Sequence, residues 1–487
     1  MNRRAFFGRA TATATTTTTA GVTTLSPYNG PWEIAQASHL LRRATFGPTP
    51  AQVNQAVAEG LSVTIGALFA PVLALDPPVY YNFENDPNVA NGETWVNTPA
   101  PIPNVPNLQG NRRRSLRAWQ FGVFQNEEVS VRQKTALFWH NHFAVNNINN
   151  GREGYQYLHV LHTHALGNFR TLVEEITVAP GMLRFLNGHQ NSRQAPNENY
   201  SRELLELFTI GRGDAAGPGD YTNYTEDDVV EMARALTGWR ATPIAEGLAS
   251  STFVNNRHDT EDKQLSHRFD DAIITDAGAE EYKVVIDHIL QQPEVARFLA
   301  RQLHIWFVGT DIDGLVEMNI IEPMAQLILD NDYEIQPALE ALLSSEYFFA
   351  EEHRGCMVSH PLDFIFRIIK SFTITSEAPL LQQYRFWDRI NRFVADQGMA
   401  IMELPSVAGW PAFYQSPQYY QFWINSVTLP KRQSLADAML NGINVAGFRW
   451  ELQLLDFIAE IEGNVDPNAL IEGISAYLFA APLGQNQ

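Results

Sequence analysis

The chain has 487 residues, of which 45% are hydrophobic, 18% charged and 11% aromatic. These proportions are those of a globular protein, and they exclude a disordered tail protein, a collagen-like chain and a coiled coil. The net charge of −20 argues against a nucleic-acid partner or an anionic membrane surface. The single cysteine, Cys356, excludes an internal disulfide and a cysteine-based metal cage. No apolar run reaches the roughly 18 residues of a transmembrane helix, so no membrane span is expected.

Residues 1–25 have the layout of an export signal. The paired Arg3 and Arg4 are followed by one spacer residue, by Phe6 and Phe7, and by a weakly hydrophobic stretch rich in Ala and Thr. This order is typical of the twin-arginine route, although a low-complexity tail would share its composition. We expect a periplasmic or extracellular protein. Because this route carries folded proteins, often with a cofactor already bound, the signal also favours a cofactor.

Apolar residues recur at helical spacing along most of the remaining chain. Caps and breakers place the predicted helices at residues 35–45, 52–69, 115–143, 155–166, 168–178, 199–210, 229–239, 280–290, 295–308, 315–329, 335–343, 362–372, 380–393, 434–440, 449–460 and 467–478. The pattern of Thr225 followed by Glu226, Asp227 and Asp228 predicts a capping box that opens the helix at 229–239. Long irregular stretches are predicted at 76–110 and 240–277. The predicted fold is therefore mainly α: a large multi-helix globular domain over 30–480 with long irregular loops, or one that is subdivided near 240–278.

Several sequence stretches together resemble one known family. The longest are HLLRRATFG (39–47), FWHNHF (138–143) and PNENYSRELLELFTIG (196–211), and shorter ones are ALTGW (235–239), HD (258–259), AGWP (408–411) and WINS (423–426). They resemble the bacterial family called domain of unknown function 1800, over roughly residues 35–440. The resemblance implies an exported protein but no established activity. Family members often carry a glycine between the His-Asp pair and a following lysine, whereas here Thr260, Glu261 and Asp262 precede Lys263.

His140 and His142 are the candidate metal ligands. Imidazole is the commonest protein ligand for transition metals, so a divalent transition metal is the candidate cofactor. Two residues apart on a regular helix, the rings would point about 200° from each other and would converge only if the helix unwinds. The alternative is that both interact with the negative end of a helix dipole. The sequence has no His-Glu-x-x-His or Gly-x-Ser-x-Gly motif, phosphate loop or dinucleotide fingerprint.

Glu203 is the candidate catalytic carboxylate. On a helical wheel it falls within the apolar arc of 199–210, beside Leu207 and Ile210, so burial is expected. A buried carboxylate needs a cation, a metal or a proton. The alternative to a catalytic role is an ion pair with a buried arginine such as Arg42, Arg43 or Arg234.

His258 and Asp259 form a further candidate catalytic pair. The dipeptide is weak evidence by itself, since about 0.6 such pairs are expected by chance in this composition. It gains interest only because the family resemblance includes it. Its place in an Asn-rich loop disfavours the chemistry of helical His-Asp phosphohydrolases.

Aromatic residues crowd the segment 410–423. Trp410, Tyr419 and Trp423 are the candidate ligand-binding residues, because aromatic rings can stack on sugars. Clusters of this kind are more often part of a core.

Three hypotheses for function follow. The first is a cell-envelope enzyme with a metal or a buried acid/base centre, in which the two histidines of 138–143 would be ligands or proton-transfer groups and Glu203 a ligand or general base. The second is a non-catalytic envelope protein that binds a glycan or a protein partner. The third is a scaffold in which buried Arg–Glu pairs hold the helices in register.

Overall fold

The computed structural model describes residues 24–459 except 73, 82–84, 102–104, 243–246 and 375–376, together with 473–475 and 477. Almost all of the predicted export signal and most of the predicted helix at 467–478 lie outside the described residues. Within the described part, helices dominate and strands occur only in short pairs. The mainly α prediction is therefore confirmed.

The α-helices follow one another along the whole chain. They are α1 (Ile34–Ala44), α2 (Pro50–Glu59), α3 (Leu61–Leu68), α4 (Leu108–Asn126), α5 (Arg132–His142), α6 (Gly151–Thr163), α7 (Phe169–Thr177), α8 (Pro180–Phe185), α9 (Glu198–Glu203), α10 (Glu226–Ala235), α11 (Glu281–Leu290), α12 (Pro293–Phe307), α13 (Gly314–Val316), α14 (Glu322–Asp330), α15 (Gln336–Leu343), α16 (Pro361–Ser371), α17 (Leu380–Ala395), α18 (Thr428–Asn441) and α19 (Leu454–Ala459).

Shorter elements connect the α-helices. The π-helical segments are η2 (Leu204–Thr209) and η6 (Glu317–Ile321), and the 3₁₀ turns are η1 (Gly188–Gln190), η3 (Asn255–Arg257), η4 (His267–Phe269), η5 (Gly278–Glu280), η7 (Glu351–His353), η8 (Pro411–Phe413) and η9 (Tyr419–Trp423). The antiparallel strand pairs are β1 (Ala215–Gly217) with β2 (Asp220–Tyr221), β3 (Trp239–Thr242) with β4 (Ser250–Phe253), β5 (Lys263–Gln264) with β6 (Ile273–Ile274), and β7 (Ile443–Val445) with β8 (Phe448–Trp450). The predicted irregular stretch 240–277 therefore contains two hairpins.

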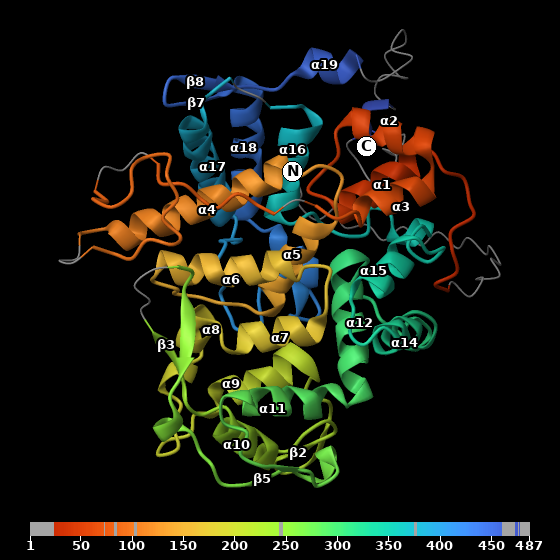
Figure 1. Ribbon diagram of the computed structural model, residues 1–487. Helices are drawn as coiled ribbons and strands as arrows, with labels where there is room; N and C mark the ends of the chain where they lie inside the picture. The colour runs from red at the N-terminus through yellow and green to blue at the C-terminus, as the bar shows by residue number, and fades with distance from the viewer. Residues whose placement is uncertain are drawn as a thin grey trace, which may run out of the picture.

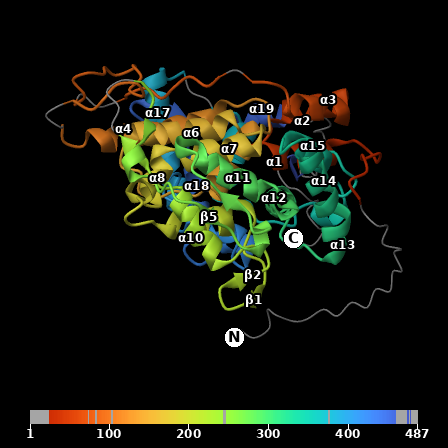
Figure 2. The ribbon, with the colours of Figure 1, turned by 60° about the horizontal axis from the view of Figure 1, so that its bottom comes forward.

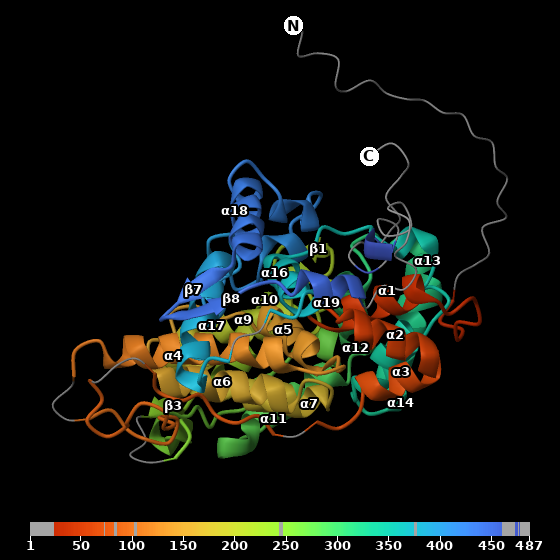
Figure 3. The same ribbon diagram turned by 90° about the horizontal axis from the view of Figure 1, so that it is seen from above.

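The helices are stacked in layers (Figure 1). α4 and α5 cross the middle of the molecule, α6 and α7 lie beneath them, and α9, α10 and α11 close the lower end together with short strands (Figure 1). The β1–β2 hairpin projects from that end (Figure 2). α17 packs along α4, and α18 with the β7–β8 hairpin stands above this pair (Figure 3). Buried hydrophobic residues from α1 to α19 form one contiguous cluster.

Several predicted helices differ from the structure. The predicted helix 115–143 is divided into α4 and α5, the one at 315–329 contains the π-helical segment η6, and the one at 449–460 begins in β8.

Two further differences have identifiable reasons. The predicted helix 52–69 is broken into α2 and α3 at Gly60, which has a φ of +86° that a right-handed helix cannot contain. The predicted helix 199–210 changes after Glu203 into the π-helical segment η2. A wheel drawn at 100° per residue therefore fails beyond that point.

Reciprocal side-chain caps begin two of the helices, of which one was predicted. Thr225 accepts from the backbone N–H of Asp228, and the Asp228 carboxylate accepts from the backbone N–H of Thr225, so the predicted capping box opens α10. Thr49 and Gln52 form the same reciprocal pair at the start of α2. Within the described residues, no helix is both long enough and apolar enough to span a bilayer.

Candidate functional site

A cavity of about 210 Å³ lies where α1, α5 and α16 meet. Its lining is rich in cationic side chains and aromatic rings. The charged and polar members are His39, Arg42, Arg43, Lys134, His360, Asp363 and Arg367, and the rings are Trp306, Phe413 and Trp423. Arg432 of α18 lies beside them, because its Nη2 donates to the carbonyl of Ser359 (2.8 Å), which also lines the cavity. We call this set the cationic pocket.

The C-terminal end of α1 supplies two of the cations. Arg42 and Arg43 stand in its last turn, where the negative end of the helix dipole favours cationic side chains. Gly47 follows with a φ of +111°, which residues with side chains rarely adopt. A Cβ at Gly47 would lie 2.9 Å from the Cα of Arg367. The glycine therefore permits the close backbone approach that places α1 against α16.

The start of α16 supplies Asp363, the one carboxylate among the described residues that line the pocket. His360 caps this helix, because its Nδ1 accepts from the backbone N–H of Asp363 (3.1 Å). The proton of the neutral ring then lies on Nε2, which is 3.2 Å from Asp363 Oδ2. Lys134 pairs with the other oxygen, and its ammonium also lies 4.9 Å from the centre of the Phe46 ring.

Asp363 is held as an anion and His360 as a neutral base. Burial alone would raise the pKa of Asp363, but His360 and Lys134 lower it below its ordinary value. Burial, together with the charge of Lys134, outweighs the opposing effect of Asp363 and lowers the pKa of His360 to about 3. The single carboxylate is thus already shared by two donors.

Three guanidinium groups of the pocket have no carboxylate partner among the described residues. Arg43 donates to the carbonyl of Val308 (2.7 Å) and lies against the sulfurs of Met357 and Cys356. Arg432 donates to a backbone carbonyl, and the buried Nε of Arg367 has no hydrogen-bond partner.

These cations repel one another. Burial, followed by the charge of Arg367, lowers the pKa of Arg42 to about 9 and that of Arg432 to about 10. Burial also lowers the pKa of Lys134, and the charges of Arg367 and Arg43 add to the effect. Buried charges normally have a partner, because leaving one unpaired costs several kcal/mol. The arrangement suits a bound oxyanion, which guanidinium groups hold through paired N–H donors.

A second cluster joins the predicted residue His258 to the buried Lys263 and Glu281 and to the exposed Asp276. His258 Nδ1 lies 3.0 Å from the carbonyl of Thr237, and its Nε2 lies 3.0 Å from Glu281 Oε2 and 3.6 Å from Asp276 Oδ1. Lys263 Nζ lies 2.6 Å from Glu281 Oε1. We call these four residues the His258 network.

The charges of the His258 network balance. Burial alone would lower the pKa of His258, but its hydrogen bonds with Glu281 and with the Thr237 carbonyl raise it above its ordinary value. One ligand atom each from His258, Asp276 and Glu281 lies within 4.8 Å of the others, as a metal site would need. However, both ring nitrogens of His258 face acceptors, which suits the protonated ring, and this ring together with Lys263 balances the two carboxylates. The network is therefore complete without a metal.

Asp259, although adjacent to His258, belongs to a different contact. Its carboxylate accepts from Arg234 Nε (2.9 Å) and Nη2 (3.3 Å), and its backbone N–H donates to Thr237 Oγ1 (2.8 Å). The predicted pair is thus divided between a buried network and a separate ion pair.

His140 lies fully inside the fold. The backbone N–H of Met402 donates to His140 Nε2 (2.9 Å), so the ring proton lies on Nδ1 and is donated to Tyr157 Oη (2.9 Å). Tyr157 donates in turn to the carbonyl of Phe143 (2.8 Å). Burial lowers the pKa of His140 to about 3. Both ring nitrogens therefore make hydrogen bonds within the protein.

His142 points to another part of the core. Its Nε2 donates to the carbonyl of Phe208 (2.8 Å), and burial lowers its pKa to about 4. Since α5 remains helical through His142, the rings of His140 and His142 diverge, and the structure does not bring them together.

Glu203 is half-buried rather than buried, which corrects the expectation from the helical wheel. It makes no ion pair within the part of the chain that the structure describes. Burial, followed by the charge of Glu206, raises its pKa. Its neighbour Arg202 pairs instead with Glu198 and Glu226. The change to a π-helix directly after Glu203 accounts for the error.

The three candidate ligand-binding aromatics have different surroundings. Trp410 is fully buried and lies beside the ring of His140, with centroids 5.8 Å apart. Trp423 is 5% exposed and lines the cationic pocket. Tyr419 is half-buried. Of the three, only Tyr419 is exposed enough for a sugar ring to stack on it in this conformation. Its ligand-binding role stays a prediction.

The sequence interpretation missed most of the pocket. It named Arg42 and Arg43 only as ion-pair partners for Glu203, and it did not single out Lys134, His360 or Arg367. One signal was present: residues 360–367 combine a helix cap, a first-turn carboxylate and an arginine one turn later, within an apolar helix. Nothing in the sequence places that helix against the arginines of 39–47.

Comparison with known protein families gives a match that covers most of the chain. The family model described as "Protein of unknown function (DUF1800)" matches residues 39–487. The chain belongs to this family. No curated protein and no solved structure matches it.

Proposed function

We propose that this DUF1800 protein binds a small oxyanion, or a molecule with an oxyanion group, in the cationic pocket and acts on it by acid–base chemistry. The observation that carries the proposal is the charge imbalance. Arg43, Arg367 and Arg432 have no carboxylate partner among the described residues, while Lys134 and His360 already share Asp363. A bound anion would supply the missing negative charge.

The cavity limits the size of the ligand. Its volume of about 210 Å³ is smaller than the roughly 300–1,000 Å³ typical of sites for drug-sized molecules. Phosphate, sulfate, a short carboxylic acid or the anionic end of a larger compound would suit this space. The aromatic walls would accept a small apolar portion.

The acid–base part of the proposal rests on one proton donor. The ammonium of Lys134 contacts Asp363 at the edge of the pocket and lies 3.5 Å from His360 Nε2. When water attacks a bound ester, Lys134 could donate its proton to the leaving oxygen while the guanidinium groups stabilise negative charge. The neutral His360 would position this pair through its hydrogen bond with the backbone of Asp363. This is the buried acid/base centre of the first hypothesis, made from other residues.

Titration calorimetry with inorganic phosphate, sulfate and acetate tests the binding. We expect at least one anion to bind, with chloride much weaker. Arg43→Gln and Arg367→Gln should each weaken that affinity about tenfold or more, because hydrogen bonds to charged groups contribute about 1.5–3 kcal/mol. Arg297→Gln is the matched control, since Arg297 pairs with Glu322 on the surface away from the pocket (2.7 Å).

The absence of binding by wild-type protein would contradict the proposal, as would equal losses in the Arg297→Gln control. Release of nitrophenol from p-nitrophenyl phosphate or sulfate tests the chemistry separately. We expect slow turnover that Lys134→Gln removes, with circular dichroism confirming that the variant still folds. No turnover by the wild type would contradict the catalytic part and leave the binding part intact.

We also propose that the chain is exported by the twin-arginine route. The supporting observation is the order of Arg3, Arg4, Phe6 and Phe7 before an Ala/Thr-rich stretch. Fractionation of cells that produce the wild-type chain should find it outside the cytoplasm, and Arg3→Lys/Arg4→Lys should retain it inside. Equal distribution of the two proteins would contradict this proposal.

A further inference from the structure

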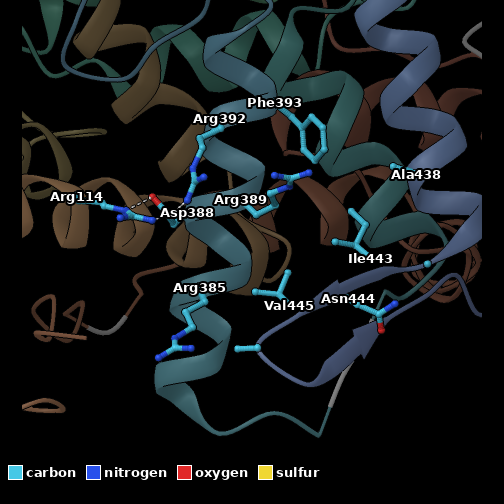
Figure 4. Close-up of a pocket in the computed structure, with 12 residues that line it drawn as sticks. Arg114, Arg385, Asp388, Arg389, Arg392, Phe393, Ala438, Ile443, Asn444 and Val445 are labelled. Carbon is cyan, nitrogen blue, oxygen red and sulfur yellow. Dashed lines mark hydrogen bonds and ion pairs between the residues drawn. The ribbon is translucent and has the colours of Figure 1, made fainter. Parts of the chain in front are cut away.

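A second concentration of arginines lines an open groove between α17, α4 and the β7–β8 hairpin (Figure 4). The groove has a volume of about 600 Å³. Four of its lining residues are arginines (Arg114, Arg385, Arg389 and Arg392), and Asp388 is the one carboxylate among the described lining residues. We call it the arginine groove. Such a surface is unusual in a chain whose net charge is −20.

The arginines are arranged by the helical repeat. Arg385, Arg389 and Arg392 are spaced four and three residues apart, so they share one face of α17 over about 10 Å of helix. Arg114 reaches the same face from α4. Asp388 pairs with both Arg114 and Arg392 and fixes their direction. Arg389 is exposed and lies 5.0 Å from the centre of the Phe393 ring.

The opposite wall is apolar and is formed by side chains. Ile443 and Val445 alternate along β7, so they extend from the same face of the hairpin toward α17 (Figure 4). Trp450 on β8 anchors the hairpin, because its ring stacks on Phe386 with centroids 4.7 Å apart. The hairpin thus presents side chains rather than a free backbone edge to the groove, which disfavours an added peptide strand.

We propose that the arginine groove binds an acidic oligosaccharide through its carboxylate or sulfate groups. Guanidinium groups hold such groups by paired hydrogen bonds, and the apolar wall would accept the C–H faces of sugar rings. The volume of about 600 Å³ lies within the roughly 300–1,000 Å³ that is typical of sites for drug-sized ligands. A single-stranded nucleic acid is disfavoured because such strands stack their bases on several aromatic side chains, whereas Phe393 is the one aromatic residue among the described lining residues.

This proposal does not depend on the cationic pocket. Calorimetry with trigalacturonate and with a heparin-derived tetrasaccharide tests it, with maltotriose as the neutral control and hexaglutamate as the acidic-peptide control. We expect at least one acidic saccharide to bind more tightly than both controls, with affinity that falls as salt rises. Arg389→Gln should weaken binding about tenfold. Arg297→Gln should leave it unchanged.

A second variant keeps the test decisive if the first effect is small. Val445→Asp places a carboxylate on the apolar wall and should remove binding by repulsion, with circular dichroism and melting temperature confirming that the hairpin still folds. The proposal is overturned if no acidic saccharide binds, if maltotriose binds equally, if hexaglutamate binds as tightly or more tightly, or if both variants bind as the wild type does.

Discussion

The cationic pocket and the His258 network are both buried groups of charges, but they differ in balance. In the network, Lys263 and His258 face two carboxylates, and each buried charge has a partner. In the pocket, five cations surround one carboxylate. Burial alone therefore does not indicate a binding site. The informative property is a buried charge whose partner is missing from the described protein.

The largest expected loss of stability comes from a variant that breaks the charge balance of the His258 network. Glu281→Gln keeps the shape of the side chain but leaves Lys263 and His258 facing only the exposed Asp276. We expect a loss of about 3–5 kcal/mol in the free energy of unfolding, as for other broken buried pairs. Urea denaturation measures it. The control Glu280→Gln, in an exposed pair with Lys283, should cost less than about 1 kcal/mol.

The next effect concerns the contact that positions the pocket. Gly47→Ala places a Cβ against the Cα of Arg367 and also strains a backbone with φ +111°. We expect a loss of about 1–3 kcal/mol or more in unfolding free energy. Gly60→Ala separates the two causes, because φ is also positive there but nothing lies within 4 Å of the added Cβ. Equal losses in the two variants would mean that the contact with α16 contributes nothing.

The stability that the cationic pocket contributes and the stability that the His258 network contributes should change in opposite directions with pH. The folded-state pKa of His360 is about 3, so below pH 6.5 the unfolded chain takes up a proton that the folded chain does not, and stability falls as pH falls. The folded-state pKa of His258 is raised, so its stabilisation is complete below about pH 6.5 and is lost as pH rises through the folded-state value.

Chemical denaturation between pH 4.5 and 8.5 checks this contrast. His360→Gln should reduce the loss of stability on the acidic side, by up to about 1.4 kcal/mol per pH unit. His258→Gln should instead change the slope above pH 6.5. Parallel curves for the two variants would contradict the assigned protonation states.

The smallest expected effect is an increase in the free energy of unfolding. Arg367→Met removes one of the repelling cations of the pocket together with an unpartnered buried Nε. Without added anion, we expect the free energy of unfolding to rise by about 1 kcal/mol, since apolar replacements of unpaired buried charges are often stabilising. A saturating anion should reverse the order of wild type and variant. A variant that is less stable under both conditions would assign Arg367 a structural role.

The sequence was sufficient for the fold class and for many helix positions. Apolar spacing and the Thr225 cap predicted α1 and α10 to within a few residues. It was insufficient where one residue changes the local geometry, as at Gly60 or at the start of η2. Neither an isolated glycine nor a Leu-rich turn specifies such a change without its tertiary surroundings.

The site was harder to predict for a physical reason. The histidines of 138–143 attracted attention because imidazole binds metals, yet their hydrogen bonds lie within the fold. Lys134 and Arg367 are separated by more than 230 residues in the sequence, and only the packing of α1 and α5 on α16 brings them together. An excess of cations is a property of that packing, so no local pattern contains it.

The π-helical segment η2 contains one residue more than an α-helical turn would need. Its backbone bonds span five residues, as from the N–H of Ile210 to the carbonyl of Leu205, so it accommodates one residue more than an α-helical turn. A relative that lacks one residue between 204 and 209 could continue α9 as a regular helix. Phe208 would then rotate by about 100° relative to the preceding turn. The carbonyl of Phe208, which accepts a hydrogen bond from His142 Nε2, would then turn away from that ring. The length of the segment 204–209 and the residue at position 142 should therefore change together through evolution.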